Sequence, residues 1–106
     1  MSSQDDRPLI LSPLAQQDII NILRYTGERW GEDQLHRYRD KLDDALRLLE
    51  QHPEIGHTHA ALSEAHRLHT VGAHVMIYRI EPLPISIVRV LHQHMSLLAH
   101  LTQEHF

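Results

Sequence analysis

The chain has 106 residues, no cysteine and 11 histidines, and its 10 basic and 14 acidic side chains give a net charge of −4 with neutral histidines. This length allows one domain with one modest core, and the lack of cysteine excludes disulfides and a thiol nucleophile. The sequence shows no apolar run long enough for a transmembrane helix and no signal peptide at its start. The acidic balance argues against nucleic-acid binding driven by bulk charge. We expect one cytoplasmic domain over residues 1–106, with residues 1–6 disordered.

The first two elements predicted in chain order are a strand and a helix. Residues 7–12 form a short apolar run, and Pro8 places the start of the strand or a sheet edge there. Ser12 followed by Pro13 is a helix-start signal, with the serine as N-cap. From Pro13 to about Trp30, helical spacing predicts one buried face, formed by Ala15, Ile19, Ile22, Thr26 and Trp30.

A second helix is predicted after Gly31, because acidic residues follow the glycine and the helix dipole favours negative charge at a helix start. It ends at His52–Pro53 because proline disfavours helical conformation in the preceding residue. Its apolar stripe comprises Leu35, Tyr38, Leu42, Ala45, Leu46 and Leu49. Because a single glycine joins the two helices, we expect an antiparallel hairpin.

The second half of the chain is rich in β-forming residues. Residues 66–71, 74–80 and 85–91 predict three strands in an antiparallel meander, and residues 92–106 predict a short terminal helix. The fold class is therefore α+β with the order β-α-α-β-β-β. The helix hairpin packs on one face of a small antiparallel sheet, and a short helical tail follows.

Histidines two residues apart suggest a possible metal site. On a strand, His57 and His59, or His92 and His94, would point to one face. A catalytic zinc usually has a third protein ligand, and no recognised spacing ties His66, His69 or His74 to either pair. The alternative is that these histidines are polar surface residues. We favour this interpretation and expect neither a metal nor a cofactor.

No strong catalytic signature is present. The sequence lacks G-x-S-x-G, H-E-x-x-H, P-loop and G-x-G-x-x-G motifs, and its carboxylates form no recognisable catalytic pair. One arginine lies in each of the last three predicted strands, Arg67, Arg79 and Arg89. Together on one sheet face they would bind phosphate or an acidic partner, whereas singly they would be solvated surface residues. We favour the second interpretation for Arg67 and leave the other two open.

A binding groove is the third possibility. One helix hairpin covers only one face of a sheet, so the tail either closes the other face or leaves a groove for a partner's helix or strand. The apolar residues of the tail are Met95, Leu97, Leu98, Leu101 and Phe106.

Five motifs in order, across roughly residues 9–101, resemble the ParE toxins of bacterial type II toxin–antitoxin systems, within the RelE/ParE superfamily. Each motif alone is weak, but their order is specific and agrees with the predicted fold. The motifs are 11–15 with Asp18 and Ile19, 25–31 with Tyr38 and Leu42, 53–56, 71–79, and 89–95.

This resemblance implies a toxin that docks on DNA gyrase, traps it on cleaved DNA and arrests growth without covalent chemistry of its own. It also implies a ParD-like antitoxin, whose disordered C-terminal part folds onto the toxin. The partners expected are this antitoxin and gyrase, with neither a membrane nor a specific nucleic-acid sequence. The residues expected to contact target or antitoxin are Arg79, Arg89, His92, Met95, Leu97, Leu98 and Leu101.

The alternative within the superfamily is a RelE-like, ribosome-dependent messenger endoribonuclease. Such enzymes need acid–base groups and cations near the scissile phosphate, and the candidates would be Arg79, Arg89, His92 and His94. Val75 stands where these nucleases often carry an arginine in the third strand, and the acidic net charge is a poor match for ribosome docking. An interaction module without toxicity is a third class.

Nine of the 11 histidines follow Pro53. They gain charge just below neutral pH, so this half is less acidic than the net charge suggests. We interpret them as a weakly basic recognition surface.

Overall fold

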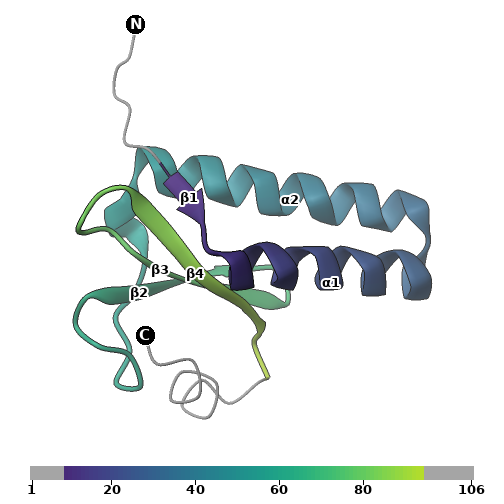
Figure 1. The fold of residues 1–106 in the computed structure, drawn as a ribbon. Coiled ribbons are helices and arrows are strands. Elements are labelled where there is room, and N and C mark those ends of the chain that lie inside the picture. The colour runs from purple at the N-terminus through teal and green to yellow at the C-terminus, as the bar shows by residue number, and fades with distance from the viewer. Residues whose placement is uncertain (1–8, 95–106) are drawn as a thin grey trace, which may run out of the picture.

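A computed structural model describes residues 9–94, which form two helices on one face of a four-stranded sheet (Figure 1). None of the helices in this part of the chain is long and apolar enough to cross a membrane. The elements are β1 (Leu9–Leu11), α1 (Pro13–Trp30), α2 (Glu32–Gln51), the 3₁₀ turn η1 (Pro53–Ile55), β2 (His66–Val71), β3 (His74–Arg79) and β4 (Ile85–His92).

The strand order in the sheet is β1-β4-β3-β2. The last three strands form the expected antiparallel meander. β1 pairs in parallel with β4 over Ile85–Ile87, so the sheet is mixed and not purely antiparallel. The parallel pairing follows from the long helical crossover between β1 and β2, which returns the chain to the far edge of the sheet.

Local sequence signals start and join the two helices. The Ser12 hydroxyl accepts a hydrogen bond from the Ala15 N–H at 3.0 Å, as expected for an N-cap. Gly31 joins α1 to α2 at a φ of 95°, a conformation that side chains disfavour, and this allows the immediate reversal. The predicted hairpin is confirmed.

The main core lies between the helices and the sheet. Leu42 and Leu49 of α2 pack with Tyr78 of β3 and with Ile87 and Val90 of β4. A bulge leaves one extra residue on β4 between the partners of Ile77 and Tyr78. The extra residue shifts the alternation of inward and outward side chains along β4, so Ile87 and Val90, three positions apart, both point into the main core.

The opposite face of the sheet carries a smaller apolar cluster. Val75, Ile77 and Leu91 are buried there, and Leu62 from the loop before β2 packs against them. Leu68 lies directly opposite Ile77 in the register, on the same side. Both faces of this sheet are therefore apolar at their centres.

Some boundary predictions are corrected. The first strand ends at Leu11 and not at Ser12, and residues 7 and 8 lie outside the described residues. Trp30, assigned to the buried stripe of α1, is 65% exposed because it lies in the last turn, beyond the sheet. The prediction of disorder at 1–6 and most of the predicted tail helix lie outside the described residues.

Candidate functional site

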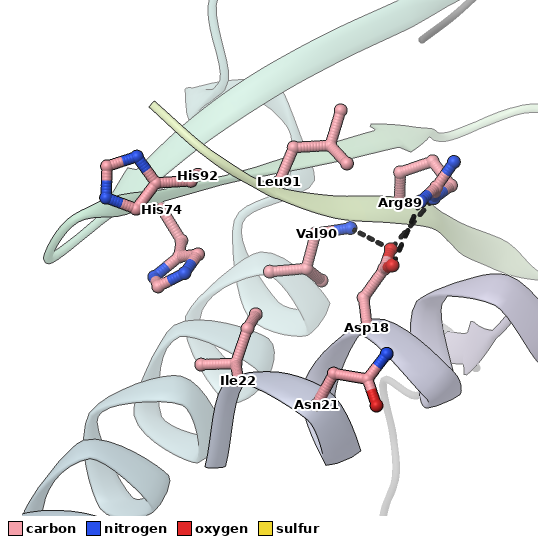
Figure 2. Close-up of a pocket in the computed structure, with 8 residues that line it drawn as sticks. All are labelled: Asp18, Asn21, Ile22, His74, Arg89, Val90, Leu91 and His92. Atoms are coloured by element: carbon pink, nitrogen blue, oxygen red, sulfur yellow. Dashed lines mark hydrogen bonds and ion pairs between the residues drawn. The ribbon is translucent and has the colours of Figure 1, made fainter. Parts of the chain in front are cut away.

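A groove runs between α1 and the end of β4 (Figure 2). It consists of two adjoining depressions of about 160 and 290 Å³ that share Ile22, His74 and His92. The smaller depression lies beside Asp18, and the larger one extends toward Trp30 at the end of α1. We call the combined surface the α1–β4 groove.

An ion pair occupies one end of the α1–β4 groove. The Asp18 carboxylate accepts hydrogen bonds from Arg89 Nε at 2.8 Å and Nη2 at 3.0 Å, and from the Val90 N–H at 2.9 Å (Figure 2). The two side chains are only 14% and 11% exposed. The pairing of β1 with β4 ends at Ile87. Beyond that point the Asp18 carboxylate accepts from the Val90 N–H at the edge of β4, so this N–H is not available to another strand.

A tyrosine–histidine pair forms the middle of the groove. The Tyr38 hydroxyl lies 2.6 Å from His74 Nδ1, accepts from the Ala73 N–H and donates to the Val71 carbonyl. The Tyr38 hydroxyl has one proton, and it donates that proton to the Val71 carbonyl. The contact with His74 is then a hydrogen bond when His74 carries a proton on Nδ1 and donates it to the hydroxyl oxygen, and Nε2 is left as an acceptor. Burial, and secondarily the charge of neighbouring His92, lowers the pKa of His74. At neutral pH this imidazole is therefore uncharged.

Two further imidazoles continue from this pair. The ring centres of His74 and His92 are 5.3 Å apart, and those of His92 and His94 are 5.1 Å apart. His94 lies past the end of β4, where its N–H donates to His92 Nδ1, so these two histidines do not share a strand face as predicted. His57 pairs with Leu68 at a different edge of the sheet. Within residues 9–94, no group of three histidine, cysteine or acidic side chains has the geometry to hold a metal.

Two large aromatic side chains line the other end. Tyr25 is 60% exposed and Trp30 is 65% exposed, and both border the depression that His74 and His92 also line. The Arg29 guanidinium lies 5.4 Å from the Trp30 ring centre, within cation–π range. Exposed aromatics beside a groove are typical of protein–protein contact surfaces.

The arginines of the three strands do not meet on one sheet face. Arg67 pairs with Tyr78 in the register and donates to the Glu54 and Gly56 carbonyls, whereas Arg79 is the next residue along β3 and points to the other side. Arg79 donates to the Pro82 carbonyl at 3.0 Å. Together with the ion pair of Arg89, these contacts leave no shared phosphate cradle.

Of the residues considered for a nuclease, Arg79 lies apart, whereas Arg89 and His92 line the same depression and His94 lies beside His92. Arg79 ends β3, whereas His92 lies opposite His74, at the other end of that strand. Five residues along a strand correspond to about 17 Å, too far for one scissile phosphate. Of the expected contact residues, His92 lines the groove and Arg89 forms its ion pair. The other members, Met95, Leu97, Leu98 and Leu101, lie outside the described residues.

Comparison with known proteins decides the family. Residues 9–97 match a sequence model described as the ParE toxin of the type II toxin–antitoxin system, parDE. The chain belongs to the ParE toxin family. Toxin ParE1 of Caulobacter vibrioides is 35% identical over 95 residues, which cover 90% of this chain and 98% of that protein. Toxin ParE1 of Mycobacterium tuberculosis is 35% identical over 88 residues, covering 82% and 90%.

A solved structure agrees on the ParE fold. A chain of the chromosomal ParDE toxin–antitoxin system from P. aeruginosa superposes with a TM-score of 0.70 at 16% identity, covering 80% of this chain and 94% of that one. At this identity the likeness concerns the fold. The expected RelE/ParE-like architecture is confirmed.

One motif that carried the ParE resemblance has a structural explanation. Tyr78 is fully buried, and its hydroxyl donates to the Pro53 carbonyl and accepts from the Gly56 N–H at 2.9 Å. A Cβ on Gly56 would lie 2.2 Å from that hydroxyl oxygen. The Pro53 carbonyl and the Gly56 N–H are therefore spaced so that both bind the one tyrosine hydroxyl beneath η1. On the solvent side of the turn, Arg67 donates to the Glu54 and Gly56 carbonyls.

Sequence reasoning missed the roles of several groove residues in this ParE chain. It placed Asp18 in a motif without assigning it a function. A carboxylate beside Ile19 on a half-buried helix face was a usable signal, because buried carboxylates usually have a basic partner. It assigned Tyr38 to the core, where the aromatic ring lies, but not its hydroxyl to His74. Tyr25 gave no signal, because a side chain's exposure depends on where the sheet ends.

Proposed function

We propose that this ParE-family protein is a toxin that arrests growth by binding DNA gyrase and that a ParD-like antitoxin neutralises it. The observation that carries the proposal is the family match over residues 9–97, together with a relative, Toxin ParE1, of which this chain covers 98%. On this proposal the toxin acts in the cytoplasm, where gyrase works.

Docking without covalent chemistry agrees with the arrangement of the polar residues. The guanidinium of Arg89 is bound to Asp18, and Arg79 lies at the opposite end of β3 from His74 and its register partner His92. The exposed aromatics of the α1–β4 groove offer a surface for a protein partner. We also propose that His92 contributes to a partner contact, with the tail residues Met95, Leu97, Leu98 and Leu101.

Induced expression tests this proposal. Expression without the antitoxin should stop colony formation and DNA synthesis, measured by thymidine incorporation, before it slows protein synthesis, measured by leucine incorporation. Co-expression of the antitoxin encoded beside the toxin gene should restore growth, and the two proteins should co-purify. Immediate arrest of protein synthesis with cleaved messenger would instead favour the ribosome-dependent nuclease. Normal growth without antitoxin would favour an interaction module.

A further inference from the structure

The outer face of the sheet, which lies away from α1 and α2, is better covered than the described residues explain. Ile77 has no exposed surface there, and Val75 and Leu91 are at most 9% exposed. We call these three residues the outer cluster. Among the described residues, the partly buried apolar side chain that packs on the outer cluster is Leu62. A fully buried side chain typically contacts about 6–12 other residues, so one leucine does not complete the cover of a cluster that spans two strands.

The chain leaves the sheet beside the outer cluster. β4 ends at His92, and the next N–H, that of Gln93, donates to the Ala73 carbonyl at 2.9 Å. Leu91 precedes this point and lies opposite Val75 in the register. Residues 95–106, which we call the tail, follow from here. As a helix the tail would be about 18 Å long, whereas four strands are about 14 Å across. The tail is therefore long enough to cross the outer face.

The tail has the apolar spacing of a helix with one buried side. Leu97, Leu98 and Leu101 fall on one stripe, and Gln103 falls on the opposite side. The acidic residue of the tail is Glu104, and β2, β3 and β4 contain no acidic residue that would repel it. The pattern of the tail and the charge of the three strands are therefore compatible with direct contact.

We propose that the tail folds back as a helix on the outer face of the sheet, with Leu97, Leu98 and Leu101 against the outer cluster. The sheet is then the middle layer between the helix hairpin and the tail. A tethered segment has an effective concentration of about millimolar, which favours the tail over a second copy or another protein on this face. In this arrangement the three leucines contribute to a partner contact by holding the tail in place, and they do not touch the partner.

Methyl NMR of the wild-type protein tests this arrangement directly. Nuclear Overhauser effects should connect the methyl groups of Leu98 and Leu101 with the outer cluster within one molecule. A mixture of isotope-labelled and unlabelled protein separates contacts within a molecule from contacts between molecules. Contacts between molecules would assign the outer face to a second copy and overturn the proposal. Tail leucines that contact Ile22 in the α1–β4 groove, or that contact no part of the outer cluster, would also overturn it.

Urea denaturation compares the two sides of the tail. Leu101→Ala should lower the urea midpoint by roughly 1 M, as expected for a truncated buried leucine. Gln103→Ala is the matched control on the opposite side of the predicted helix, and it should shift the midpoint by less than about 0.3 M. Equal midpoints for the two variants would overturn the proposal.

Thiol labelling reports on the cover itself, because the natural chain has no cysteine. Val75→Cys should react slowly with a thiol reagent, and adding Leu98→Asp should speed this reaction by roughly tenfold or more as the outer face opens. Val90→Cys, on the helix side of the sheet, is the control and should stay protected with or without Leu98→Asp. An unchanged rate at Val75→Cys, or the same acceleration at both positions, would overturn the proposal. All three measurements use this protein alone, so their outcome does not depend on gyrase or an antitoxin.

Discussion

Removal of one buried hydroxyl should destabilise the whole domain. Tyr78 has no exposed surface, and its hydroxyl is hydrogen-bonded to both the Pro53 carbonyl and the Gly56 N–H. Tyr78→Phe keeps the ring but leaves these two groups beneath η1 without their partner. An unsatisfied buried group costs about 1–3 kcal/mol, so we expect a loss of about 2–3 kcal/mol in the free energy of unfolding.

Urea denaturation followed by circular dichroism measures this loss directly. For a domain of this size the expected change lowers Tm by roughly 10 °C. Tyr25→Phe provides the matched control, because Tyr25 is 60% exposed and the same hydroxyl is removed in water. If the two variants unfold within about 0.5 kcal/mol of each other, the account of the turn beneath Tyr78 is wrong.

Three further outcomes follow from the structure. Gly72→Ala should lower stability by about 1–3 kcal/mol, since Gly72 has a φ of 55° and an added Cβ would lie 2.7 Å from the Tyr38 hydroxyl oxygen; an unchanged urea midpoint would contradict this. Asp18→Asn should cost about 3 kcal/mol by leaving the nearly buried Arg89 without its carboxylate, whereas a neutral effect would mean that the ion pair adds nothing. Burial lowers the pKa of His66, His69 and His74 in the folded state. The free energy of unfolding should therefore be highest above pH 6.5 and fall as the pH drops toward 5, and urea midpoints that do not change over this range would refute the expectation.

Elements governed by local interactions were predictable from the sequence. Ser12 followed by Pro13 marked the start of α1, and Gly31 marked the reversal between the helices, because caps and turns depend on residues close in the chain. The apolar spacing of α2 identified its buried face, including Leu42 and Leu49. The meander followed from three β-rich runs with short connections.

Features that depend on distant residues were not predictable. The parallel pairing of β1 with β4 is decided by where the helix hairpin returns the chain. The bulge in β4 is set by pairing with β3, and it determines which of the closely spaced apolar residues enter the core. The partnership of Asp18 with Arg89 joins residues 71 positions apart, and single-sequence spacing contains no signal for it.

The candidate groove illustrates the same limit. Sequence analysis predicted His92 as a contact residue and grouped it with Arg79, but the structure places Arg79 at the opposite end of the strand pair. Trp30 was assigned to the core because helical spacing continues to the end of α1, whereas the sheet does not extend that far. The periodicity of a helix predicts a face, and only the tertiary structure shows how far that face is covered.

A supercoiling assay with purified DNA gyrase tests the central claim most directly. Addition of the purified toxin should inhibit supercoiling and accumulate gyrase-linked cleaved DNA in a dose-dependent manner, and antitoxin added first should abolish both effects. A Tyr78→Phe toxin held below its melting temperature should remain active, since Tyr78 is buried away from the proposed contact surface. Gyrase that stays fully active with excess toxin, while the same preparation cleaves ribosome-bound messenger, would contradict the account.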